Sequence, residues 1–102
     1  MESLSLTLIQ KDIYWESPER NLRAFKTMLE SIKHSSDIIV LPEMFNTGFT
    51  KNISLVEEFN GLTINFLTEE ARKLNSVIAV TIPLKYNGNI YNMFIWMKPD
   101  GS

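Results

Sequence analysis

The sequence predicts an α/β fold built on a mixed β-sheet, and three observations support that class. Apolar runs typical of strands alternate with amphipathic runs typical of helices along most of the 102 residues. Proline and glycine stand between these runs, where strands and helices are expected to end. Asn87-Gly88 then signals a two-residue hairpin turn, so the last strand is expected to run antiparallel to its neighbour.

The first three expected elements form a β-α-β unit. Residues 4–10 alternate leucines with smaller or polar residues and predict a strand. Ser17 and Pro18 predict a helix start, because serine can cap free amides and proline fits the first turn. Apolar residues then recur at helical spacing for about 16 residues. The apolar run 38–41 predicts a strand buried on both faces of a parallel sheet.

A second β-α-β unit and a hairpin follow. Residues 46–60 predict a long mixed loop, which Asn60-Gly61 closes. Residues 62–75 predict a second amphipathic helix, with its charged residues, Glu70 among them, on the outward side. Residues 77–84 predict the third strand, and residues 90–98 the last one.

Glu43 is the candidate catalytic residue, because a strand ends immediately before it. Pro42 has no amide hydrogen to give to a sheet and restricts Leu41 to an extended backbone. In open α/β sheets, ligands bind at the carboxyl ends of the strands. A carboxylate between Pro42 and Met44 is expected to lose part of its hydration, which suits a general base. The alternative is a solvated loop acid without a chemical role.

Composition excludes several classes of function. The formal charge of -2 supplies no basic footprint for nucleic acid. No apolar run approaches the roughly 20 residues that cross a bilayer, and the N-terminus does not resemble a signal peptide, so we expect a cytoplasmic protein without a membrane partner. The chain has no cysteine, which excludes disulfides, thiolate metal sites and a cysteine nucleophile within it.

The sequence offers no metal site and no nucleotide site. His34 is the only histidine and lies at the end of the first expected helix, where an imidazolium suits the helix dipole. Its neighbours are not metal ligands, so we predict a structural or solvated role for it. Gly48 is isolated, and no glycine-rich phosphate-binding loop occurs.

The residues around Glu43 resemble the glutamate motif of the nitrilase, or carbon-nitrogen hydrolase, superfamily, and most of all its omega-amidase-like branch. The motif here is Leu41-Pro42-Glu43-Met44-Phe45, followed by Thr47-Gly48-Phe49. The resemblance implies a Glu-Lys-Cys triad in which Glu43 is the general base, a cysteine attacks an amide or nitrile carbon, and a lysine helps to stabilise the tetrahedral intermediate. It implies no metal and no organic cofactor. Phe45 and Phe49 either bind the substrate or pack the loop down.

A second part of the resemblance lies near the end of the chain. Asn92 in a strand, followed by the turn Pro99-Asp100-Gly101, is similar to a pattern of the same superfamily. If Asn92 is buried, it needs hydrogen-bond partners. In relatives, the catalytic lysine follows this turn after another short strand. We therefore expect residues 1–102 to be the N-terminal portion of a carbon-nitrogen hydrolase domain, truncated before the catalytic lysine and cysteine.

The resemblance also implies an architecture. Superfamily members form an αββα sandwich, and this chain is expected to supply its N-terminal part, a mixed sheet with two helices on one face. The other face of the sheet is apolar as well, and no element of the chain remains to cover it. An exposed apolar surface of that size predicts that the chain forms homo-oligomers or aggregates through it.

The function implied for the full-length parent is hydrolysis of small omega-amides of 2-oxo acids. The parent would be an amidohydrolase acting on non-peptide C-N bonds, with a small-molecule amide as substrate. The chain alone is expected to be inactive, because a base without its nucleophile leaves no covalent route. The competing hypothesis is a small non-catalytic α/β binding or interaction module, in which Glu43 is a surface acid and the apolar sheet face binds a partner.

Overall fold

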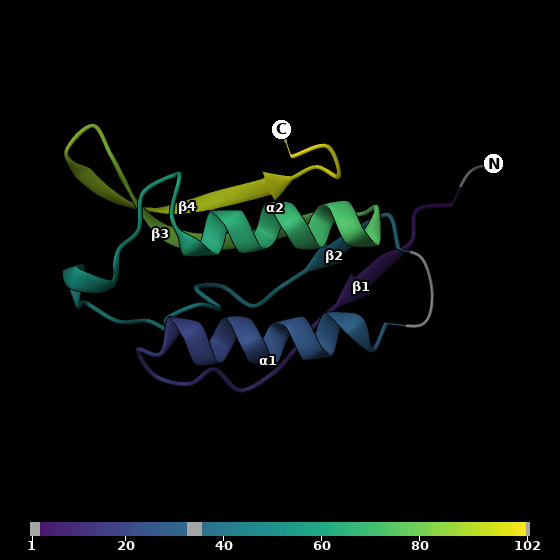
Figure 1. The fold of residues 1–102 in the computed structure, drawn as a ribbon, viewed down its shortest axis with the longest axis horizontal. Helices are drawn as coiled ribbons and strands as arrows, with labels where there is room; N and C mark the ends of the chain where they lie inside the picture. The colour runs from purple at the N-terminus through teal and green to yellow at the C-terminus, as the bar shows by residue number, and fades with distance from the viewer. Residues whose placement is uncertain (1–2, 33–35, 102) are drawn as a thin grey trace.

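The computed structural model describes residues 3–32 and 36–101 and confirms the mixed α/β fold. The strands lie side by side in the order of the chain, with β1 parallel to β2, β2 parallel to β3, and β3 antiparallel to β4 (Figure 1). Their bounds are β1 Leu6–Leu8, β2 Ile38–Val40, β3 Val77–Tyr86 and β4 Asn89–Met97. His34 falls outside the described residues.

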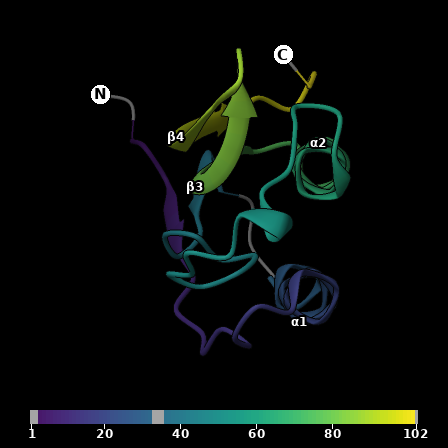
Figure 2. The ribbon, with the colours of Figure 1, turned by 90° about the vertical axis from the view of Figure 1, so that its left-hand side faces the viewer.

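Two α-helices cover one face of this sheet, as expected. They are α1, Pro18–Glu30, and α2, Leu62–Leu74, and Figure 2 shows both on the same side of the strands. A short 3-10 helix, η1, Ile53–Leu55, interrupts the loop that follows Glu43. Within the described part of the chain, none of the helices is long and apolar enough to cross a membrane.

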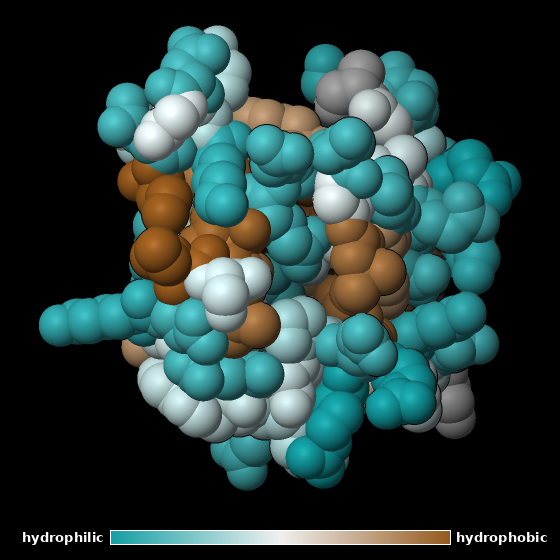
Figure 3. Space-filling view, turned by 60° about the vertical axis from the view of Figure 1, so that its left-hand side comes forward, coloured by the Kyte–Doolittle hydropathy of each residue, from teal (hydrophilic) through white to brown (hydrophobic). Residues whose placement is uncertain are grey.

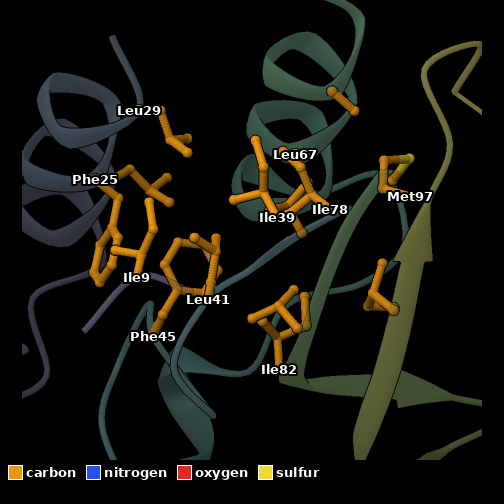
Figure 4. Packing of buried hydrophobic residues seen from close by; sticks show 14 of the residues in the cluster. Ile9, Phe25, Leu29, Ile39, Leu41, Phe45, Leu67, Ile78, Ile82 and Met97 are labelled. Carbon is orange, nitrogen blue, oxygen red and sulfur yellow. The ribbon is translucent and has the colours of Figure 1, made fainter. Parts of the chain in front are cut away.

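The core fills the space between the helices and the sheet (Figure 4). Phe25 and Leu29 on α1 and Leu67 on α2 are fully buried, and they face the side chains that the central strands direct toward the helices. Each such side chain stabilises the fold by about 1.5–3 kcal/mol through removal of apolar surface from water. This layer contains Leu41, just beyond β2, and the strand residues Ile39, Ile78, Val80, Ile82, Leu84, Ile95 and Met97.

Glu70 departs from the expectation that all charged residues of α2 point outward. It is only 3% exposed, and its Oε2 lies 3.5 Å from Nζ of Lys73. The physical reason is helical geometry, because position 70 lies three residues after Leu67 and therefore on the same buried stripe. The apolar pattern alone did not predict the burial of Glu70, because Ala71, four residues after Leu67, continues the helical spacing of apolar residues equally well.

The face of the sheet away from the helices is open and apolar. Side chains that stand opposite one another in the register share a face, so Leu6 and Leu8 lie on the same side as Ile38 and Val40. The exposed large apolar residues on this face include Leu6 at 55%, Leu8 at 68%, Phe94 at 60% and Trp96 at 45%. The uncovered apolar face is thus present, and self-association through it stays a prediction.

Candidate active site

Glu43 lies on an arch that crosses the carboxyl end of the sheet, immediately after β2. The backbone nitrogen of Leu41 donates to the carbonyl oxygen of Ala79 at 3.0 Å. The backbone nitrogen of Met44 donates to the carbonyl oxygen of Thr81 at 2.9 Å and lies 3.2 Å from the hydroxyl oxygen of the same residue. The arch is therefore fastened to β3 on both sides of Glu43, at the edge of the sheet where ligands bind in open α/β folds.

The chain turns sharply at Met44. Its φ of 50° is in the left-handed region, which is costly for a residue with a side chain. Met44 and Leu41 are buried, whereas the Glu43 side chain between them is exposed. This exposure corrects the expectation that Glu43 loses part of its hydration. The turn directs the flanking apolar side chains inward and leaves the carboxylate at the surface.

Asn92 is the hydrogen-bond partner of Glu43. Its Nδ2 donates to Glu43 Oε1 at 3.0 Å, although the two residues are 49 positions apart. Among residues 3–32 and 36–101, the structure records no other hydrogen bond of this carboxylate. One carboxylate oxygen is thus held in place, and the other has no partner within the described residues. A carboxylate in this arrangement can accept a proton from a neighbouring group.

The register of the hairpin places Asn92 near the arch. Asn92 stands opposite Pro83 in the register. The carbonyl oxygen of Thr81 and the backbone nitrogen of Lys85, on either side of Pro83, form hydrogen bonds with the loop that follows β2 and not with β4. Pro83 therefore directs its nitrogen to that same side, and its missing amide hydrogen costs the β3–β4 ladder nothing. Asn92 and Pro83 form a non-hydrogen-bonded pair, in which facing residues approach most closely.

Phe45 anchors the loop that begins at Glu43. The ring is 0% exposed and meets Phe25 of α1 edge to face, with 5.1 Å between the ring centroids. A second ring, that of Phe66 on α2, lies 6.2 Å away. Of the two predicted alternatives for Phe45, substrate contact and packing of the loop, this burial matches packing.

Asn46 ties the same loop to both helices. It is fully buried, its carbonyl oxygen accepts from Asn21 Nδ2 at 2.8 Å, and its own Nδ2 donates to Thr63 Oγ1 at 3.1 Å. These two hydrogen bonds hold the backbone in one conformation, whereas Oδ1 of Asn46 is buried without a partner among the described residues. The segment after Glu43 is therefore supported by α1 and α2 as well as by β3.

Phe49 is the second aromatic residue predicted to bind the substrate. It lies just beyond Gly48, whose φ of 78° turns the chain, and it is 68% exposed. A large apolar side chain with this exposure is available for contact with a ligand or with another part of the protein. Contact between Phe49 and a substrate stays a prediction.

A hollow of about 180 Å³ lies beside the Glu43–Asn92 pair, between the loop that contains η1 and the β3–β4 hairpin. Figure 3 brings forward the end of the molecule at which the parallel strands finish, where hydrophobic areas alternate with hydrophilic ones. A larger groove of about 580 Å³ lies between α1 and α2 and shares no residue with this hollow. The hollow is lined by Met44, Thr50, Lys51, Asn52, Ile53, Leu55, Val56, Pro83, Ile90, Tyr91 and Asn92.

Sequence reasoning identified Asn92 but not its partner. It expected hydrogen-bond partners for Asn92 if this residue is buried, whereas Asn92 is exposed and still pairs with Glu43 at the surface. The usable signal was a polar residue in an otherwise apolar strand. Metal binding has no support in the described residues, where no group of three or more His, Cys, Asp or Glu side chains converges.

The chain is similar in sequence and in fold to known proteins. It is 33% identical to an omega-amidase of Escherichia coli K12 and 35% identical to one of Yersinia enterocolitica, over 100% of this chain and 40% of each relative. It matches the crystal structure of a CN-hydrolase superfamily protein of Xanthomonas campestris with a TM-score of 0.94 and 28% identity, over 100% of this chain and 39% of that one.

The chain spans about 40% of the length of the curated relatives it matches. A more distant structure, that of an N-terminal amidase, has a TM-score of 0.87 at 18% identity and supports the fold alone. The family model described as carbon-nitrogen hydrolase matches residues 5–102, almost the whole chain. Together with the arch that carries Glu43, this match shows that the chain belongs to the carbon-nitrogen hydrolase family.

Proposed function

We propose that this chain supplies the general base, Glu43, of an enzyme that hydrolyses small omega-amides of 2-oxo acids. The observation that carries the proposal is the Glu43–Asn92 pair at the carboxyl edge of the sheet, beside a hollow of about 180 Å³. The hollow is smaller than the pockets of roughly 300–1,000 Å³ that hold drug-sized ligands, so a substrate bound there would be a smaller molecule.

The proposed reaction uses a Glu-Lys-Cys triad, of which this chain holds the glutamate. The sequence contains no cysteine, so the nucleophile belongs to the rest of the full-length protein, and we assign the lysine to it as well. Glu43 takes the proton of the cysteine thiol as the sulfur attacks the amide carbon, and it passes that proton to the nitrogen, which leaves as ammonia when the C-N bond breaks. Glu43 then takes a proton from the water that attacks the acyl-enzyme, and it returns this proton to the sulfur as the acid is released.

Asn92 is a positioning residue in this proposal. Its amide fixes Oε1 of Glu43 and leaves Oε2 for proton transfer. The substrate class is supported by the names of the relatives, which include omega-amidases and a 2-oxoglutaramate amidase of Bacillus subtilis that is 23% identical over 100 residues. Phe49, exposed at the same edge, is proposed to contact the substrate.

The proposal is tested by measuring ammonia released from 2-oxoglutaramate by the full-length gene product and by the 102-residue chain. We expect turnover by the full-length protein and none by the chain alone, because the triad acts as a unit. In the full-length protein, Glu43→Gln should lower kcat by about 10²–10⁴-fold, as for loss of a general base. Asn92→Leu should cause a smaller loss, because the base remains but is no longer oriented.

The matched control is Glu58→Gln, which alters an exposed glutamate of the loop before α2 that does not line the hollow. It should leave kcat unchanged, and circular dichroism should show all variants to be folded. Release of ammonia by the pure 102-residue chain, or full activity of the Glu43→Gln variant, would contradict the proposal.

A further inference from the structure

One positive charge lines the hollow beside the Glu43–Asn92 pair, and the proposed chemistry does not yet use it. Two residues of its lining connect the hollow to the Glu43 carboxylate. Met44 follows Glu43 in the sequence, and Asn92 donates a hydrogen bond to it. Lys51, in the loop after Phe49, lines the same hollow. Among the described residues that line it, Lys51 alone carries a formal charge at neutral pH.

The ammonium group of Lys51 is available for a ligand. Within residues 3–32 and 36–101, the recorded ion pairs are Arg72–Glu69 and Lys73–Glu70, both on α2. Lys51 itself is exposed and belongs to neither pair. A lysine ammonium offers three donors and a compact charge, which suit a carboxylate.

We propose that Lys51 binds the carboxylate of an anionic amide substrate whose amide group lies beside Glu43. This inference rests on the proposed function and adds to it the residue that makes the enzyme selective for an anionic amide over a neutral amide of equal length. The other lining residues are apolar or neutral, so they hold the carbon chain without preference for charge.

Two physical effects favour the anion at this position. Direct contact replaces water around the substrate carboxylate with a charge-assisted hydrogen bond, whose loss costs about tenfold in kcat/KM. The positive charge also raises the local concentration of anions, an effect that salt weakens. Substitution of Lys85 distinguishes the two effects, because this lysine lies on β3 near the hairpin and contributes positive charge but does not line the hollow.

The experiment uses the full-length gene product and two probes, glutaramate and pentanamide. Both are five-carbon amides, and they differ in that the far end is a carboxylate or a methyl group. We expect wild-type protein to prefer glutaramate and Lys51→Gln to reduce kcat/KM for glutaramate about tenfold without altering that for pentanamide. Lys51→Arg should restore most of the preference, and Lys85→Gln should leave it intact.

A second readout covers the case of slow pentanamide turnover. Glutarate, which carries the carboxylate but no amide, should inhibit wild-type hydrolysis of 2-oxoglutaramate competitively, and Lys51→Gln should raise its inhibition constant about tenfold. An unchanged inhibition constant, or equal losses for both amides, would overturn the role of Lys51 while leaving the hydrolase activity standing. Failure of the wild-type protein to hydrolyse 2-oxoglutaramate would instead overturn the proposed function.

Discussion

Gly48 and Gly88 share a left-handed backbone but differ in what surrounds them. Their φ angles are 78° and 80°. A Cβ built on Gly48 would lie 3.1 Å from Cε3 of Trp15, whereas one on Gly88 meets nothing within 4 Å. Gly48 also lies five residues after Glu43 in the turn that supports the candidate site. The glycine of the hairpin serves backbone geometry alone, and Gly48 serves close packing as well.

We predict that Gly48→Ala lowers the free energy of unfolding by about 2 kcal/mol, and Gly88→Ala by about 1 kcal/mol. The shared part is the cost of a left-handed alanine, and the difference is displacement of the Trp15 ring. Urea unfolding of the full-length gene product and of both variants measures the two losses. Equal losses would show that Trp15, which is 62% exposed, moves aside at no cost.

The two helices begin in different ways. Ser17 precedes α1 but its side chain makes no capping hydrogen bond, so Pro18 at the helix start is the feature that the prediction had right. At α2, Glu57 performs the capping from six residues upstream. Its Oε1 accepts from the backbone nitrogen of Thr63 at 2.6 Å, and its backbone carbonyl oxygen accepts from the backbone nitrogen of Lys85 at 2.9 Å. Glu57 thereby joins the loop, α2 and β3.

Glu57→Ala is expected to lower the free energy of unfolding by about 1–2 kcal/mol, because it leaves the backbone amide and the hydroxyl of Thr63 without their acceptors. Ser17→Ala should change it by less than about 0.5 kcal/mol, since no capping bond is lost. Denaturant titration of the two variants side by side makes the comparison. A cost for Ser17→Ala as large as that for Glu57→Ala would contradict the assignment of the caps.

The molecule as a whole has one covered and one uncovered sheet face. The αββα sandwich implied by the family resemblance would bury the open face against a second sheet, which we assign to the rest of the full-length protein. In the 102-residue chain alone, Leu8 and Phe94 expose 68% and 60% of their surface. Apolar groups with this exposure on one face of the sheet favour association between chains through the hydrophobic effect.

We therefore expect the isolated chain to sediment as oligomers or aggregates, and the double variant Leu8→Thr, Phe94→Thr to shift it toward monomer. Its unfolding free energy should change little, because both side chains are mostly exposed and threonine is favoured in strands. Leu62→Thr is the control, since Leu62 is 53% exposed but lies on α2. A wild-type chain that sediments as a stable monomer at all concentrations would count against self-association.

The sequence by itself determined the order and type of the elements and the position of Glu43 at a strand end. Hydrophobic periodicity and the breaks at Pro42, Gly61 and Asn87-Gly88 act over a few residues, so they are legible without a structure. The ends of strands were less well determined, because β1 extends only over Leu6–Leu8, where it pairs with the equally short β2.

Only the tertiary structure decided which side chains surround Glu43. The Asn92 contact spans 49 residues and depends on the β3–β4 register, and the exposure of Glu43 depends on the turn at Met44. The burial of Glu70 and the remote cap from Glu57 depend on how α2 packs against the sheet and the loop. Such contacts arise between segments far apart in the chain, and local sequence patterns carry no information about their register or distance.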